Sequence, residues 1–149
     1  MKPTTNKAKE KIAVSACLLG VACRYDAKSK KHEAVCRYLE DKEVFLICPE
    51  VMGGLTIPRK PCELQNGHAI NEQGEDMTIY YQKGAEEVEA LMKREGIELA
   101  LLKSKSPSCG HGFIYDGTFT KTLVEGDGIC AKWLLKHGFK VISSAEFED

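Results

Sequence analysis

Four short apolar runs recur along the chain, and each ends close to residues that interrupt regular structure. Serine, glycine or proline stands within three residues of the C-terminal end of every run. Apolar runs of roughly four to eight residues with such boundaries are typical of buried strands. The pattern therefore predicts four strands, at residues 11–17, 43–48, 98–103 and 139–142.

Longer stretches with helical spacing separate these runs, at residues 31–42, 78–95 and 128–137. The middle stretch carries the clearest signals, because Asp76 is placed to cap its N-terminus and Gly96 is placed to end it. Its expected apolar stripe consists of Tyr80, Ala85, Val88, Leu91 and Met92. Strands that alternate with helices predict an α/β fold, a single domain with a mostly parallel sheet of about four strands and helices on both faces.

Two segments are too long or too patterned to be simple connections. Residues 49–75 exceed the ~12–15-residue limit usual for a structureless loop, so we expect partial order or a functional role there. Within them, Asn66-Gly67 favours a type I′ hairpin. Residues 113–124 indicate a second hairpin, which we expect to turn at Asp116-Gly117.

The composition suits one folded domain, with 43% hydrophobic and 29% charged residues in a chain of 149. We expect this domain to span residues 11–149, after a flexible polar tail at residues 1–10. Twenty-one basic and 22 acidic side chains leave a formal charge of −1, which argues against a duplex nucleic-acid binder. No apolar run approaches the ~20 residues that cross a bilayer, and the start lacks an apolar signal core. We therefore expect no membrane contact and a cytoplasmic location.

Seven cysteines are the most informative feature of the composition. In a reducing compartment they are not expected to form disulfides, and an odd number cannot pair internally. Metal binding or thiol chemistry therefore becomes the leading interpretation. Core filling is the alternative for each of them, because free cysteine is among the most buried residue types.

Three of the cysteines, Cys17, Cys48 and Cys109, stand at or just beyond the carboxyl ends of predicted strands. In a parallel sheet these ends share one edge, where ligands bind. We therefore expect three thiols that are far apart in sequence to converge. Zinc with an open fourth position and an iron–sulfur cluster with one open iron both fit three cysteines, and the spacing does not choose between them.

The residues around these cysteines resemble the domain-of-unknown-function family (DUF) number 523, whose characterised members are thiouracil desulfidases. The resemblance rests on three blocks: VSACLLG at 14–20 with CRYD at 23–26, CPEVMGGL at 48–55 with PR at 58–59, and SPSCG at 106–110 with IYDGTF at 114–119. It covers residues 11–144, nearly the whole chain. Cys62 and Cys130 depart from the family pattern, at places where small residues without a thiol are common.

This resemblance implies a [4Fe-4S] cluster held by Cys17, Cys48 and Cys109, and the hydrolytic removal of sulfur from thiouracil. It also implies that Glu50 is catalytic, together with Ser106 or, as the alternative, Ser108. An open iron polarises the C–S bond and accepts the sulfur, while the attacking water needs a base such as Glu50. Such a cluster is sensitive to oxygen, so an aerobically purified sample can lose it.

Other polar residues are candidates for binding the substrate, namely Asp26, Arg59 and His111. Each has a simpler interpretation as a solvated basic side chain or a member of a local ion pair. Cys36 and Cys130 fall within expected helices, where core filling is favoured. Cys23 and Cys62 are expected to be loop thiols.

The sequence favours a desulfidase that acts on a small thiolated pyrimidine, as the free base or a nucleoside, because the balanced charge argues against tRNA. Two alternatives stay open. One is a zinc-dependent hydrolase that uses the same three cysteines, and the other is a non-enzymatic carrier of sulfur or of a cluster, which has no need of Glu50. The pattern indicates no particular oligomeric state.

Overall fold

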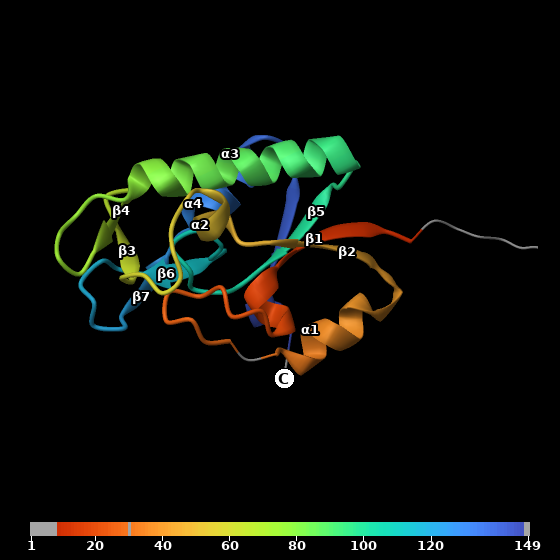
Figure 1. Ribbon diagram of the computed structural model, residues 1–149, viewed down its shortest axis with the longest axis horizontal. Coiled ribbons are helices and arrows are strands. Elements are labelled where there is room, and N and C mark those ends of the chain that lie inside the picture. The colour runs from red at the N-terminus through yellow and green to blue at the C-terminus, as the bar shows by residue number, and fades with distance from the viewer. Residues whose placement is uncertain (1–8, 30, 148–149) are drawn as a thin grey trace, which may run out of the picture.

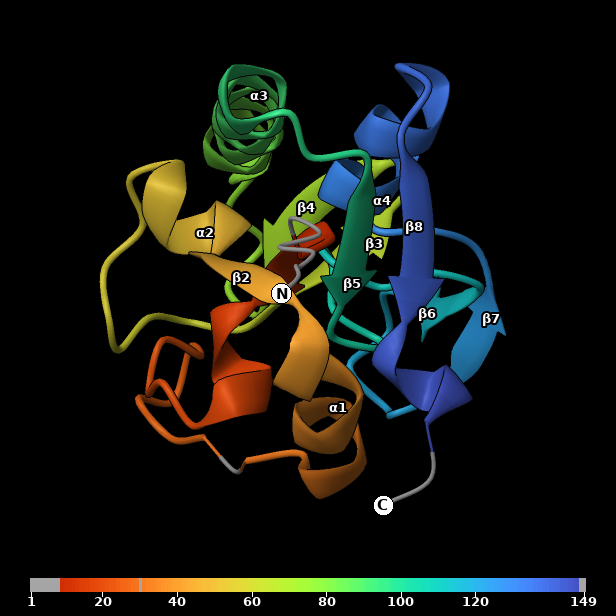
Figure 2. The same ribbon diagram turned by 90° about the vertical axis from the view of Figure 1, so that its right-hand side faces the viewer.

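The computed structural model describes residues 9–29 and 31–147, so the tail expected at residues 1–10 falls mostly outside the described part. Four parallel strands form the central sheet, in the order β2-β1-β5-β8 (Figures 1 and 2). They are β1 (Lys11–Ser15), β2 (Glu43–Ile47), β5 (Leu99–Leu102) and β8 (Lys140–Ser143). Each predicted apolar run supplies one of them, which confirms the α/β fold and the single domain.

Helices cover both faces of the sheet (Figure 1). They are α1 (Glu33–Tyr38), α2 (Pro49–Met52), α3 (Thr78–Glu95) and α4 (Ile129–Lys136), with 3-10 turns at Ala16–Leu19, Leu39–Asp41 and Ser144–Glu146. The helix predicted at residues 78–95 is confirmed, whereas the stretch 31–42 forms α1 followed by a 3-10 turn. None of the helices in the described part of the chain is both long and apolar enough to cross a membrane.

Alternate side chains of β1 enter two different hydrophobic clusters. Ala13 belongs to the cluster that α3 and α4 cover, whereas Ile12 and Val14 belong to the cluster beneath α1. All three side chains are fully buried. Because successive side chains of a strand point to opposite faces, β1 is buried on both sides, as the inner strands of a parallel sheet are.

The buried face of α3 starts one residue later than predicted. Tyr81 is 1% exposed and Tyr80 is 40% exposed, so the prediction that Tyr80 belongs to the apolar stripe is wrong. Helical spacing from position 81 leads to the other buried apolar side chains, Ala85, Val88 and Met92. Leu91 packs against the same hydrophobic cluster and is partly buried.

The start of α3 also differs from the expected cap. Met77, and not Asp76, occupies the N-cap position. Asp76 still contributes, because its Oδ1 accepts a hydrogen bond from the backbone N of Thr78 at 2.9 Å. A carboxylate there satisfies one of the amide groups that the start of a helix leaves unpaired.

Two glycines bring α2 against α3. A Cβ atom on Gly84 would lie 1.9 Å from the carbonyl oxygen of Pro49, and one on Gly53 would lie 1.9 Å from the carbonyl oxygen of Tyr80. The two backbones therefore meet at a distance that only glycine allows. Because α2 carries Glu50, this contact sets the position of that carboxylate.

Replacing Gly84 with alanine should lower the free energy of unfolding by about 1–3 kcal/mol, although alanine is the better helix former. The added methyl group would overlap the Pro49 carbonyl, and relief requires α2 to move. Urea unfolding of the two proteins measures the difference. Lys83→Ala, at an exposed position of the same helix, should stay within about 0.5 kcal/mol of wild type. Equal stability of Gly84→Ala would show that the two helices pack less closely.

The hairpin predicted at Asn66-Gly67 is confirmed. It joins β3 (Cys62–Gln65) to β4 (His68–Asn71), which pair antiparallel. Asn66 and Gly67 have φ angles of 51° and 82°, as both central residues of a type I′ turn require. Part of the long segment between residues 49 and 75 is therefore ordered.

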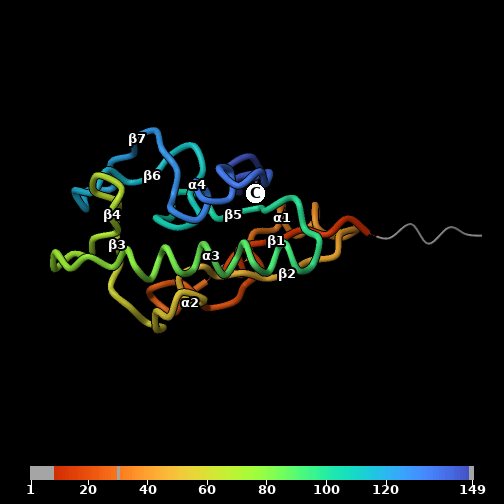
Figure 3. The backbone as a smooth tube through the Cα atoms, turned by 90° about the horizontal axis from the view of Figure 1, so that it is seen from above, coloured from red at the N-terminus to blue at the C-terminus, as the bar shows by residue number. Residues whose placement is uncertain are grey.

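The second hairpin is also present, but its predicted turn is wrong. β6 (Phe113–Tyr115) pairs antiparallel with β7 (Leu123–Glu125), and the chain between them continues well beyond Gly117. Gly117 contacts β3 instead, because its N donates to Glu63 Oε1 at 3.1 Å and its carbonyl accepts from Gln65 at 2.8 Å. The two hairpins thus lie side by side at one end of the molecule (Figures 1 and 3).

Candidate functional site

The three cysteines singled out in the sequence all lie in segments that follow the carboxyl ends of sheet strands. Cys17 lies in the 3-10 turn after β1, Cys48 lies between β2 and α2, and Cys109 lies in the loop after β5. β5 and β8 point toward this edge in Figure 2. The parallel register of β1 with β2 and β5 brings these strand ends to one edge of the sheet.

A fourth thiol joins two of these cysteines. The side chain of Cys23 interacts with the thiols of Cys17 and Cys48. Cys48 also donates from Sγ to the carbonyl oxygen of Cys23 at 3.7 Å. The interaction with Cys17 is the largest cause that raises the pKa of Cys23, and the interaction with Cys23 is the largest cause that raises the pKa of Cys48. The sequence assigned no role to Cys23.

Cys109 is 5% exposed and lies beside the other polar groups of this edge. Its sulfur accepts a hydrogen bond from Ser108 Oγ at 3.7 Å. Burial raises the pKa of the Cys109 thiol to about 12, and the nearby charges of Glu50 and Cys48 act in the same direction. In residues 9–29 and 31–147, no group of three or more His, Cys, Asp or Glu side chains lies close enough together to hold a metal ion.

The carboxylate of Glu50 stands between a guanidinium and a hydroxyl. Its Oε1 accepts from Arg59 Nε at 3.0 Å, and its Oε2 accepts from Ser108 Oγ at 2.9 Å. The Glu50 and Arg59 side chains are only 14% and 7% exposed, so solvent screens this ion pair little. Pro49 suits the first position of α2, because that position needs no amide hydrogen.

Arg59 connects this carboxylate to the cysteine loop. Its Nη2 donates to the carbonyl oxygen of Cys23 and its Nη1 donates to that of Thr56, each at 2.9 Å. Together with the bond to Glu50, these contacts mean that all three guanidinium nitrogens donate to groups of the protein. The arrangement indicates that Arg59 orients Glu50 and the Cys23 backbone.

Ser106 and Ser108 have different surroundings in the loop after β5. The Ser106 hydroxyl accepts from the backbone N of Ser108 and of Cys109, at 3.1 and 3.0 Å, and so shapes the turn. Ser108 contacts Glu50 directly, and the two hydroxyl oxygens are 3.0 Å apart. The first turn of α4 holds this loop, because the backbone N atoms of Cys130 and Ala131 donate to the Ser108 carbonyl.

The two remaining substrate-binding candidates lie in other contacts. Asp26 accepts from the backbone N of Lys28 at 3.0 Å and pairs with Arg24 at 3.6 Å, within its own turn. His111 Nδ1 lies 2.8 Å from Asp127 Oδ1. Within the described residues, no hydrogen bond or ion pair joins either side chain to the Glu50 carboxylate.

The other cysteines occupy apolar surroundings. Cys62 begins β3, so its prediction as a loop thiol is wrong, and it packs with Tyr81 in a small hydrophobic cluster. Cys130 is fully buried in the large hydrophobic cluster beneath α3 and α4. Cys36 is half-buried in α1.

Two further side chains near the site escaped the sequence analysis. Burial raises the pKa of Tyr81 well above its usual range, and interactions of its hydroxyl with Glu50 and Cys62 act in the same direction. Lys103 follows β5 directly, and burial lowers its pKa while the charges of Cys17 and Cys109 oppose that shift. The one sequence signal for Lys103 is its position at the end of a predicted strand, at the edge of the sheet where ligands bind.

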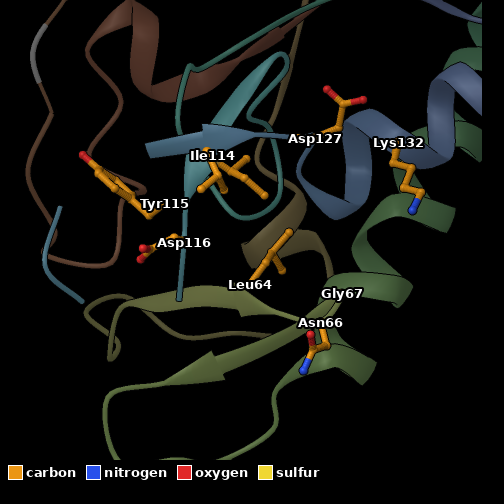
Figure 4. Close-up of a pocket in the computed structure, with 10 residues that line it drawn as sticks. Leu64, Asn66, Gly67, Ile114, Tyr115, Asp116, Asp127 and Lys132 are labelled. Atoms are coloured by element: carbon orange, nitrogen blue, oxygen red, sulfur yellow. The ribbon is translucent and has the colours of Figure 1, made fainter. Parts of the chain in front are cut away.

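A pocket of about 470 Å³ opens beside this site, between the two hairpins and α4 (Figure 4). Its wall includes Leu64, Ile114, Asp127 and Lys132. The candidate cysteines and Glu50 lie outside that wall. Asp127 also pairs with His111, so it links the pocket to the loop that carries Cys109.

The fold and the site together define a class of protein: a parallel α/β domain with a thiol-rich carboxyl edge and a partly buried carboxylate beside it. Within that class, the 2-thiouracil desulfurase family model matches residues 12–146. The chain therefore belongs to the 2-thiouracil desulfurase family.

Two similar proteins extend this result. An uncharacterized protein of Bacillus subtilis (strain 168), YbbK, is 38% identical over 148 residues, which cover 93% of this chain and 98% of YbbK. The solved structure of TudS, described as a [4Fe-4S]-dependent thiouracil desulfidase, is 43% identical with a TM-score of 0.85 and covers 93% of both chains. The family resemblance inferred from the sequence is confirmed.

Proposed function

We propose that this protein is a [4Fe-4S]-dependent desulfidase that hydrolyses a thiolated pyrimidine, converting thiouracil to uracil and sulfide. Membership of the desulfurase family and the likeness to TudS support this function. The structural observation that carries it is the Glu50 carboxylate, held between Arg59 and Ser108 beside the thiol-rich edge. A carrier of sulfur or of a cluster has no use for such a carboxylate.

Cys17, Cys48 and Cys109 are the proposed ligands of the cluster. Thiolates are the usual ligands of iron–sulfur clusters, so the donor set at this edge fits the group. When three thiolates bind it, such a cluster supplies one iron without a protein ligand, which polarises the C–S bond and accepts the sulfur. A cysteine binds metal as its thiolate, and the raised pKa values of Cys48 and Cys109 keep both thiols protonated in the metal-free protein. Loading of the cluster therefore releases protons.

Glu50 is the proposed base that removes a proton from the attacking water. The carboxylate accepts from Arg59 and Ser108 and also interacts with Tyr81, which leaves at least one of its about four lone pairs for that water. Ser108 donates to Glu50 and lies within hydrogen-bonding distance of Ser106. The two hydroxyls thus form a path by which the proton returns from Glu50 toward the departing sulfur.

Asp26 and His111 are the proposed contacts of the pyrimidine ring. The contacts of Arg59 support a positioning role for it, exerted through Glu50. Because His111 Nδ1 pairs with Asp127, Nε2 of the neutral imidazole is left as an acceptor for an N–H group of the ring. A free base or a nucleoside is the proposed substrate, and seven free cysteines support the proposed cytoplasmic location.

Anaerobic reconstitution tests this function directly. Protein loaded with iron and sulfide should carry about four irons per chain, absorb broadly in the visible range and release uracil and sulfide from 2-thiouracil. A loaded protein without turnover would indicate a carrier instead. A colourless protein whose activity requires zinc would indicate the zinc hydrolase.

A further inference from the structure

Core filling does not explain the burial of Cys23. Its side chain is 7% exposed, yet the three hydrophobic clusters formed by the described residues do not include it. Cys62, Cys109 and Cys130, the other buried thiols, all belong to one of these clusters. Cys23 is therefore buried among polar groups and sulfur.

The surroundings of Cys23 hold it beside two proposed iron ligands. Its thiol interacts with those of Cys17 and Cys48, which follow different strands of the sheet. Its carbonyl oxygen accepts from Cys48 Sγ and from Arg59 Nη2, so the backbone of this loop residue is fixed on two sides. The same guanidinium binds Glu50, which places Cys23 on the side of the site where hydrolysis is proposed.

We infer that Cys23 is a fourth iron ligand. Until the substrate arrives, it binds the iron that has no ligand among the other three cysteines. This inference rests on the proposed function, since it presupposes a [4Fe-4S] cluster on Cys17, Cys48 and Cys109. The Cys23 thiol gives its proton to solvent, and its thiolate replaces the solvent ligand of that iron by one Fe–S bond. When the substrate's sulfur binds, this bond breaks and the thiolate takes a proton back from solvent, with no change in oxidation state at either step. Cys23 thereby protects the open iron, and it is dispensable for hydrolysis because that iron must be free when sulfur binds.

Loss of one iron under mild oxidation tests this role, because a cluster with an unprotected iron converts to a [3Fe-4S] form that is visible by EPR. Wild type, Cys23→Ala, Cys23→Ser and Cys36→Ala are loaded anaerobically and treated with limiting ferricyanide. Both Cys23 variants should load about four irons, and their clusters should convert to the [3Fe-4S] form about 10-fold faster than that of wild type. Changes to residues around a metal site commonly have effects of this size. Cys36→Ala should behave as wild type, since Cys36 lies in α1.

The remaining outcomes separate this inference from the proposed function. Equal conversion rates in wild type and both Cys23 variants would overturn the fourth-ligand role and leave the desulfidase intact. Failure of both variants to load any cluster would overturn it too, because Cys23 would then be one of the essential ligands. Failure of wild type to load a cluster would contradict the proposed function itself.

Discussion

Replacing Glu50 with glutamine should lower the turnover of 2-thiouracil by about 10²–10⁴-fold, while the visible absorbance of the cluster stays unchanged. Glutamine keeps the size of the side chain and still accepts one hydrogen bond, but it cannot take a proton from water. Glu50 is nearly buried and fixed by Arg59 and Ser108, so no solvent-exposed carboxylate replaces it. The measurement is uracil release by both proteins, loaded to the same iron content.

The matched control is Glu87→Gln, which changes an exposed carboxylate on α3 in the same way. It should keep wild-type turnover. Equal rates for Glu50→Gln and wild type would remove Glu50 from the mechanism. Loss of the cluster in Glu50→Gln would assign Glu50 to cluster binding, which the thiol ligands alone are proposed to perform.

The fold was largely predictable because its signals are local. Each strand of the sheet is a short apolar run closed by a breaker, and the period of the buried residues sets the length of α3. Asn66-Gly67 determines its hairpin because both residues tolerate positive φ. The turn predicted at Asp116-Gly117 failed because a distant contact decided the outcome there: β3 holds Gly117 through Glu63 and Gln65.

The convergence of the site was predictable for a different reason. Strand polarity alone brings the residues after β1, β2 and β5 to one edge of the sheet, so Cys17, Cys48 and Cys109 could be singled out without any contact being known. The role of each thiol as an iron ligand stays a prediction. It rests on ligand chemistry and on the family.

Contacts between loops could not be read from the sequence. Arg59 reaches Glu50 across nine residues and Ser108 reaches it across 58, and neither spacing has a period or a motif that predicts it. Cys23 looks like any loop thiol until its neighbours are known. Tyr81 was missed because a one-residue error in the phase of α3 exchanges it with Tyr80.

Replacing Cys109 with serine should lower turnover by more than ~10²-fold and reduce the iron retained after gel filtration, since even partners of metal ligands cost ~10–100-fold. A serine hydroxyl stays protonated at neutral pH and is a poor ligand for iron. Only Cys17, Cys23 and Cys48 would then remain at this edge to hold a cluster. The iron without a protein ligand would no longer be the one placed for the substrate, so turnover should fall. Iron content and uracil release, measured on the same anaerobic samples, test both effects.

Cys36→Ser is the control for loss of a thiol away from the edge, and it should match wild type in iron and turnover. Thermal unfolding of the iron-free proteins separates ligand loss from misfolding. Cys109→Ser should unfold at nearly the wild-type temperature, because Ser108 can form a hydrogen bond with the new hydroxyl as it does with the Cys109 sulfur. Full iron content together with wild-type turnover in Cys109→Ser would contradict the assignment. The third essential ligand would then be Cys23, whose thiol already contacts those of Cys17 and Cys48.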